Sequence, residues 1–168
     1  MVDGLRALGI SDEQVLTAIN NVPRHWFLDN AFLEYAYQNK AFPIGSGQTI
    51  SHPYTVAYQT QLLEIKKGEK VLEVGTGCGY QTSVLVQMGA KVFSIERQQT
   101  LFVKTKQFMS DANIRAKLFY GDGYQGIPVF APYDKVIVTA GAPFVPEALI
   151  AQMVEGGRLV IPVGEGDK

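Results

Sequence analysis

Five short apolar runs from residue 70 onward constrain the fold of the chain most. Each run is apolar throughout rather than alternating, as in strands that are covered on both faces of a parallel sheet. Turn residues follow the runs, and amphipathic segments at 81–88, 98–112 and 146–153 would form right-handed crossovers between strands. The pattern predicts a doubly wound α/β fold with a mostly parallel sheet. The five runs are 70–74, 91–95, 116–120, 135–138 and 158–163.

The first third of the chain has helical patterns and predicts a cap on that sheet. An amphipathic helix over 11–22 would begin at Ser11, with Gln14 three residues later completing a capping box. A second helix is predicted over 30–37, and Pro53 favours the first turn of a third helix that runs to about residue 65. His25 beside Trp26 is interpreted as cap packing. Four aromatic residues are interpreted as core rather than as a peptide-stacking surface, namely Phe27, Phe32, Tyr35 and Tyr37.

Length and composition predict one domain spanning 1–168. The 168 residues, 46% of them hydrophobic, suit a single compact unit with its own core. Neither a Pro/Gly/Ser-rich linker nor a repeat divides the chain. Within the domain, residues 1–66 would form the helical cap and active-site loop, and residues 67–168 the cofactor-binding α/β core.

Charge and cysteine usage exclude several classes of partner. A net charge of −1 provides no large positive field for nucleic acid or an anionic membrane surface. No apolar stretch of about 18 residues and no secretory leader is present, which favours a cytoplasmic protein. Cys78 is the only cysteine and has no His or Cys companion at metal-ligand spacing, so no metal is expected. A monomer is the default expectation.

The strongest local signal is the glycine loop that follows the run 70–74. Gly75, Gly77 and Gly79 allow a tight turn and a close approach of backbone N–H groups to a ligand. The dinucleotide-binding motif G-x-G-x-x-G would need a glycine at position 80, which is Tyr80. The P-loop would need Gly-Lys followed by Ser or Thr, and no Gly-Lys pair is present. Both phosphate-binding motifs are therefore disfavoured. Taken alone, the loop is as consistent with a packing turn as with a cofactor site.

Two acidic residues at neighbouring strand ends favour the cofactor interpretation. Glu96 ends the second run about 20 residues after the glycines, where this fold presents a carboxylate to ribose hydroxyls. Asp122, beside Gly123 at the end of the third run, could accept a hydrogen bond from an exocyclic amine. The alternatives are a solvated Glu before Arg97 and a tight Asp-Gly turn. Together with the glycines, these residues indicate a nucleoside site without a phosphate cradle, which suits S-adenosylmethionine.

Segments spread over nearly the whole chain match one enzyme family in residues and in order. They are Gln48-Thr49-Ile50-Ser51-His52-Pro53, the glycine loop 71–80, and residues 121–126, 132–140 and 156–164. With these segments the chain resembles the bacterial protein-L-isoaspartate O-methyltransferases. The glycine loop is common to many methyltransferases, whereas the Gln-Thr-Ile-Ser block is close to diagnostic of this family.

The resemblance implies a Rossmann-like, S-adenosylmethionine-dependent methyltransferase fold with an N-terminal helical cap. The three loop glycines would back the methionine end of the cofactor, Glu96 would hold the ribose, and Asp122 with Gly123 would flank the adenine. Family members continue past residue 164 through a further strand pair, so we expect that pair to be missing from this sheet. Further implied cofactor contacts are Gln48, Thr49, His52, Thr76 and Arg97.

The resemblance also assigns an acceptor site. Ser51 matches the family's active-site hydroxyl and would donate a hydrogen bond that aims the acceptor carboxylate. From the residues alone, Ser51 could instead cap the helix that begins near Pro53. Cys78 is interpreted as a space-filling residue of the glycine loop. The implied substrate contacts are Pro43, Ile44, Ser51, Val138, Thr139 and Ala140.

The implied reaction is methyl transfer from S-adenosylmethionine to the free carboxylate of L-isoaspartyl or D-aspartyl residues in damaged proteins and peptides. S-adenosyl-L-homocysteine would be the second product, and the methyl ester would convert spontaneously, through a succinimide, partly to normal aspartate. The alternatives are a methyltransferase for another carboxylate or small molecule, and a non-catalytic module that senses the cofactor. The block from Gln48 to Pro53 argues against the first alternative, and the sensing module would not need the Thr49-Ile50-Ser51 loop.

Overall fold

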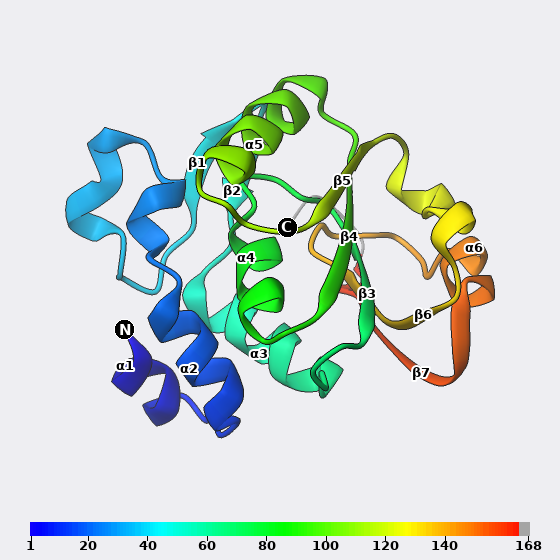
Figure 1. The fold of residues 1–168 in the computed structure, drawn as a ribbon. Helices are drawn as coiled ribbons and strands as arrows, with labels where there is room; N and C mark the ends of the chain where they lie inside the picture. The colour runs from blue at the N-terminus through cyan, green and yellow to red at the C-terminus, as the bar shows by residue number, and fades with distance from the viewer. Residues whose placement is uncertain (165–168) are drawn as a thin grey trace.

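The computed structural model describes residues 1–164, and the last four residues of the predicted α/β core, 165–168, lie outside that range. Five parallel strands form the central sheet in the order β5-β4-β3-β6-β7 (Figure 1). This order, with β3 in the middle and the chain winding outward in both directions, confirms the predicted doubly wound sheet. The strands are β3 (Lys70–Val74), β4 (Lys91–Glu96), β5 (Lys117–Tyr120), β6 (Tyr133–Val138) and β7 (Met153–Val160).

Helices cover both faces of the sheet, which explains why its strands are apolar throughout. On one side lie α3 (Pro53–Leu63), α4 (Tyr80–Gln87) and α5 (Gln99–Asp111), and on the other lies the short α6 (Glu147–Ala151) (Figure 1). Val71 packs toward α3 and α4, whereas its neighbour Leu72 packs toward α6, and both side chains are fully buried. Two 3₁₀ turns, η3 (Gly123–Gln125) and η4 (Pro128–Phe130), replace a helix between β5 and β6.

The N-terminal helices begin differently from the sequence prediction. A helix not predicted, α1 (Val2–Ala7), precedes α2 (Glu13–Asn21). The N-cap of α2 is Asp12 rather than Ser11, because the Asp12 carboxylate accepts hydrogen bonds from the first free amides of the helix. The Ser11 amide instead donates to the Gln61 side chain at 2.8 Å. The predicted Ser11 capping box is therefore wrong.

The segment 30–37, predicted as a second helix, folds into the 3₁₀ turn η2 (Asn30–Tyr35), and a further 3₁₀ turn, η1 (Arg24–Phe27), precedes it. Phe27 is buried and Phe32 packs on the same core, as predicted. Tyr35 and Tyr37 are each 46% exposed, so their assignment to the core is wrong. Because η2 is wound as a 3₁₀ helix and ends at Tyr35, the chain does not continue the face that an α-helix over 30–37 would have buried.

A small antiparallel hairpin of β1 (Phe42–Gly45) and β2 (Gln48–Ile50) joins the cap to α3. The sequence analysis did not predict this hairpin, since both strands are short and the turn between them is glycine-rich. The edge strand β7 also begins earlier than the apolar run 158–163. Met153 pairs with Tyr133, and the register shifts before Arg158, across the exposed residues Glu155 and Gly156, so no continuous apolar pattern marks this part of the strand.

The cap packs directly on the core of the sheet domain. Residues from α1 and α2 share one apolar cluster with Val56 of α3 and with Tyr80 and Val84 of α4. One face of α3 is buried at four positions, Val56, Ala57, Thr60 and Leu63. Among residues 1–164, no helix combines the length and apolar character needed to cross a bilayer.

Candidate active site

A cavity of about 640 Å³ opens at the carboxyl ends of β3, β4 and β6. The hairpin strand β2 and the loop that leads into α3 form its remaining wall. Carboxyl ends of neighbouring parallel strands meet at one sheet edge, so residues far apart in sequence converge here. Fourteen predicted site residues line it: Ile44, Gln48, Thr49, Ser51, Gly75, Thr76, Gly77, Glu96, Arg97, Asp122, Gly123, Val138, Thr139 and Ala140.

Three predicted site residues do not line the cavity. Pro43 is exposed on β1, where the alternation of side chains turns it away from the wall that Ile44 forms. His52 is the N-cap of α3 and points to solvent. Gly79 is buried beneath the loop, where an added Cβ would lie 3.0 Å from Thr105 Cγ2. Gly79 thus serves close packing of the loop on α5.

The backbone at Gly75 requires glycine for two reasons. Its φ of +97° lies in the region that L side chains rarely adopt, and an added Cβ would lie 2.6 Å from Thr139 Oγ1. That hydroxyl donates to the Gly75 carbonyl at 2.6 Å, and the Gly75 amide donates to the Ile95 carbonyl at 2.9 Å. The first turn of the glycine loop is therefore fixed to the ends of β4 and β6.

Glu96 is a buried structural element of the site, because it is only 5% exposed. One carboxylate oxygen accepts from the Gly77 amide and the other from the Gln98 amide, each at 2.8 Å. The alternative of a solvated Glu is therefore wrong. Each oxygen retains a lone pair beyond these bonds, so the carboxylate can accept further hydrogen bonds from a ligand in the cavity.

Asp122 combines the two interpretations that the sequence left open. Its carboxylate accepts from the Tyr124 amide at 3.0 Å and caps η3, which is the tight turn expected of Asp-Gly. Its side chain is also exposed and lines the cavity, so a second acceptor oxygen remains free for a ligand. Gly123 packs so closely on Val74 that an added Cβ would overlap Val74 Cγ1 at 2.3 Å.

Ser51 lines the cavity without capping the helix that follows. The N-cap of α3 is His52, and no side-chain capping bond is made there. The capping alternative for Ser51 is therefore wrong. Within residues 1–164 the Ser51 hydroxyl makes no hydrogen bond, which leaves it available to a ligand. The Ser51 carbonyl accepts from Arg24 Nη2 at 2.8 Å, so a buried arginine holds this loop from behind.

The remaining titratable residues near the cavity offer no nucleophile or metal site. Desolvation raises the pKa of the Cys78 thiol to about 11, so it stays protonated at neutral pH and is inert, as predicted. His25 is held by the Tyr37 hydroxyl at 2.6 Å and packs edge-on to Trp26, consistent with cap packing. No cluster of three potential metal ligands occurs within the described part of the chain.

The sequence analysis missed several cavity residues that carry no motif. Tyr80 and Gln81 reach the cavity from the first turn of α4, and Tyr124 stacks on Phe144 at a centroid distance of 5.7 Å. Their only sequence signal is their position next to the glycine loop and to Asp122. Which side chains at the start of α4 face the cavity depends on how the helix is rotated about its axis, and the sequence pattern does not specify that rotation.

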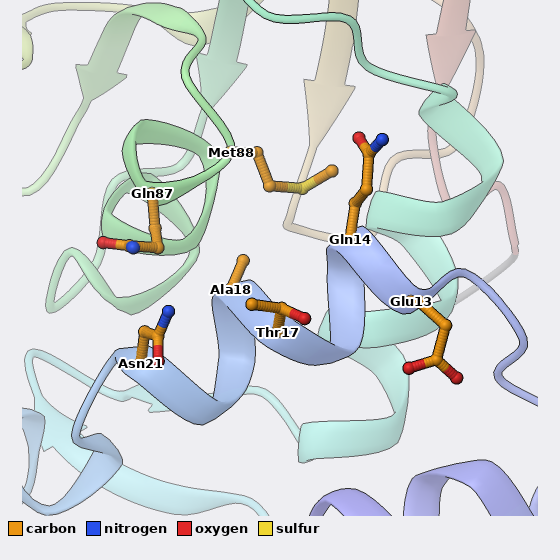
Figure 2. Close-up of a pocket in the computed structure, with 7 residues that line it drawn as sticks. All are labelled: Glu13, Gln14, Thr17, Ala18, Asn21, Gln87 and Met88. Carbon is orange, nitrogen blue, oxygen red and sulfur yellow. The ribbon is translucent and has the colours of Figure 1, made fainter.

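A second groove, of about 350 Å³, lies between α2 and the end of α4, away from the glycine loop (Figure 2). Amide side chains dominate it, and Glu13 is its only ionisable residue. It contains neither a nucleophile nor a pair of carboxylates, so it offers no chemistry of its own. Its lining residues are Glu13, Gln14, Thr17, Ala18, Asn21, Gln87 and Met88 (Figure 2).

Solved structures with this fold place the chain among methyltransferases. A protein-L-isoaspartate O-methyltransferase superposes with a TM-score of 0.88 and 32% identity, covering 96% of this chain and 54% of that one. A putative relative from Plasmodium falciparum, solved in complex with S-adenosyl-L-homocysteine, superposes with a TM-score of 0.83 and 25% identity. That match covers 98% of this chain and 83% of the other.

Sequence comparisons identify the family. The protein-L-isoaspartate O-methyltransferase of Christiangramia forsetii is 64% identical over 165 residues, covering 98% of this chain and 78% of the relative. That of Flavobacterium psychrophilum is 59% identical over 169 residues, covering 100% and 79% respectively, so both relatives are longer than this chain. The family model of protein-L-isoaspartate(D-aspartate) O-methyltransferase matches residues 1–168. The chain therefore belongs to the protein-L-isoaspartate(D-aspartate) O-methyltransferase family.

Proposed function

We propose that this chain is a protein repair methyltransferase that methylates the free carboxylate of L-isoaspartyl, and also D-aspartyl, residues in damaged proteins and peptides. The observation that carries the proposal is the convergence of Ser51 with the glycine loop, Glu96 and Asp122 around one cavity. Membership of the family supplies the reaction, and the cavity supplies the residues for it. S-adenosyl-L-methionine is the methyl donor.

The residues around the cavity fit this cofactor. Gly75, Thr76 and Gly77 would lie along its methionine end, where an added Cβ on Gly77 would fill space toward Ile44. Glu96 would accept hydrogen bonds from the ribose hydroxyls, and the free oxygen of Asp122 would accept from the adenine amine. When bound, S-adenosylmethionine supplies an electrophilic methyl group on a sulfonium and leaves as S-adenosyl-L-homocysteine. Further proposed contacts are Gln48, Thr49, Arg97 and Gly123.

The acceptor side of the site needs no general base. A carboxylate has an unperturbed pKa of about 4 and is already ionised at neutral pH. Ser51 would therefore act by donating a hydrogen bond that aims one carboxylate oxygen at the methyl carbon. Such positioning is worth up to about 7 to 11 kcal/mol in favourable systems. Ile44, Val138, Thr139 and Ala140 would contact the flanking peptide and exclude water from the reacting groups.

The test of the function is methyl transfer from labelled S-adenosylmethionine to two peptides that differ only in an L-aspartyl or L-isoaspartyl linkage. We expect labelling of the isoaspartyl peptide alone. The Christiangramia forsetii relative serves as the positive control. Cofactor binding without labelling of either peptide would favour the cofactor-sensing alternative. Preferential labelling of other carboxylates or of small molecules would favour a methyltransferase with a different acceptor.

Ser51→Ala should lower kcat for the isoaspartyl peptide by about 10- to 100-fold, because one charge-assisted hydrogen bond of about 1.5 to 3 kcal/mol is lost. Affinity for S-adenosyl-L-homocysteine should stay within a few fold. Ser46→Ala, in the exposed turn of the hairpin, is the matched control and should leave both values unchanged. Unchanged turnover in a folded Ser51→Ala variant would contradict the proposed role.

We further propose that the chain acts as a cytoplasmic monomer and does not use nucleic acid or membranes as partners. The support is its net charge of −1 and its single cysteine, which lines the cavity and has no partner in the chain. Substrates would then be other proteins and peptides that carry a damaged aspartyl residue.

A further inference from the structure

Arg24 is a completely buried cation in the cap, with 0% of its surface exposed. Its guanidinium donates hydrogen bonds to three carbonyls, two in the connection between η2 and β1 and the third at Ser51. Nε donates to Ala36 at 3.0 Å, and Nη2 donates to Lys40 at 3.1 Å and to Ser51 at 2.8 Å. One side chain thus joins the end of η2, the approach to β1 and the Ser51 loop.

The charge of Arg24 is not neutralised by the part of the protein that the structure describes. No carboxylate within residues 1–164 forms an ion pair with it, and its Nη1 is buried without a hydrogen-bond partner. The nearest compensation is the ring of Tyr80, whose centroid lies 4.9 Å from the guanidinium carbon. A buried, unpaired cation is costly, so its retention calls for an anion that arrives from elsewhere.

Two of the residues that contact the Arg24 guanidinium, Ser51 and Tyr80, line the active-site cavity. The Ser51 loop and Tyr80 stand between the guanidinium and the cavity, and each contacts both. The positive charge therefore lies directly behind the wall at which Ser51 would receive the acceptor. Water does not screen a charge in this position well, because both the guanidinium of Arg24 and the ring of Tyr80 are buried.

We propose that Arg24 is a positioning and specificity-determining residue that makes the acceptor pocket select an anionic carboxylate. It acts in two ways, through its field and through the three hydrogen bonds that hold the Ser51 loop in place. The carboxylate of the acceptor is the missing counter-ion of the cap. This inference rests on the proposed function, since it assigns the acceptor to the Ser51 side of the cavity.

The test compares two peptides that differ in one group. One carries the isoaspartyl linkage with its free α-carboxylate, and the other carries a carboxamide at that position. The affinity of the protein for each peptide is measured with S-adenosyl-L-homocysteine present at a saturating concentration. Wild type should prefer the carboxylate by about tenfold or more, which corresponds to about 1.4 kcal/mol. A wild type that binds both peptides equally would overturn the inference.

Two variants separate the charge of Arg24 from its hydrogen bonds. Arg24→Lys keeps the charge, but a lysine cannot donate to all three carbonyls. The affinities for both peptides should therefore fall together, while the preference for the carboxylate peptide stays within about threefold of the wild-type value. Arg24→Gln keeps hydrogen-bonding capacity without charge, so the preference should fall to about threefold or less. Affinity for S-adenosyl-L-homocysteine should change little in either.

The control is Arg6→Gln, which removes an arginine from the surface of the same cap, where it pairs with Glu13 at 2.9 Å. It should leave the carboxylate preference at the wild-type value. If the role of Arg24 were purely structural, Arg24→Gln would lower the affinity for both peptides equally and leave the preference for the carboxylate peptide intact. If Arg24→Gln does not fold, the lysine variant decides alone, because loss of preference with the charge retained would contradict the inference.

Failure of the proposed function is distinguishable from failure of this inference. If wild type binds the carboxylate peptide selectively but transfers no methyl group to it, the function is wrong and the pocket assignment stands. If wild type methylates the isoaspartyl peptide and Arg24→Gln discriminates as well as wild type does, the function stands and the role of Arg24 is overturned.

Discussion

Gly75→Ala should weaken binding of S-adenosyl-L-homocysteine by about 100-fold or more, and should lower the free energy of unfolding by about 1 to 3 kcal/mol. Alanine is strained at a φ of +97°, and its Cβ would lie 2.6 Å from Thr139 Oγ1. Relief of that overlap has to move either the loop or the end of β6. Both line the cavity, so the cofactor site loses its shape even if the domain stays folded.

A matched control and a double variant test this explanation. Gly141 lines the same cavity, has no positive φ and has open space where a Cβ would be added, so Gly141→Ala should stay within about threefold of wild type. Removing the opposing hydroxyl in Gly75→Ala/Thr139→Ala should recover part of the lost affinity, since only the φ strain would remain. Calorimetry with S-adenosyl-L-homocysteine measures the affinities. Equal losses in Gly75→Ala and Gly141→Ala would contradict it.

Glu73→Gln should remove a pH dependence of stability between about pH 5 and pH 8. Glu73 lies on β3 directly before the glycine loop and is 0% exposed. The Thr82 hydroxyl donates to one carboxyl oxygen, whereas the other has no partner within the described residues. Burial is the main cause that raises the pKa of Glu73 from 4.5 to about 7.

The raised pKa means that the native state holds a proton that the unfolded chain releases. Between pH 4.5 and about 7, the free energy of unfolding therefore falls as the pH rises. Above that range, the contribution of Glu73 to the free energy of unfolding no longer changes with pH. Wild type should lose roughly 2 to 3 kcal/mol from this group between pH 5 and pH 8. Glutamine stays neutral and keeps an acceptor for Thr82, so the variant should match wild type near pH 5 and exceed it at pH 8.

Denaturant unfolding at pH 5 and pH 8 measures this difference. Glu34→Gln, at an exposed position in η2, is the control and should change the pH dependence of stability little. A Glu73→Gln variant whose stability relative to wild type is the same at both pH values would show that Glu73 does not hold an extra proton in the native state.

The doubly wound parallel sheet was readable from the sequence because it follows from local pattern. Continuous apolar runs, most of them followed by a helix, leave little choice but a parallel sheet with both faces covered. Such a sheet brings the ends of its strands to one edge. Gly75, Glu96, Asp122 and Thr139 therefore line one cavity although they are spread over more than a third of the chain.

The errors fall where the tertiary structure chooses between local options of similar energy. Asp12 and Ser11 are both good N-caps. Gln61 of α3 accepts from the amides of both residues, and with the chain held there the Asp12 carboxylate accepts from the first amides of the helix. Pro43 and His52 stand next to cavity residues in sequence, but strand alternation and the start of α3 turn them outward.

The sequence by itself determined the doubly wound sheet, the glycine loop and the family, since each depends on residue order and short-range pattern. Only the tertiary structure decided which side chains enter the cavity and which stand behind it. Arg24 has no motif that marks it as part of the site. Its position behind Ser51 results from three carbonyls and one ring that separate segments bring together. Such long-range convergence is fixed by packing, which no local pattern records.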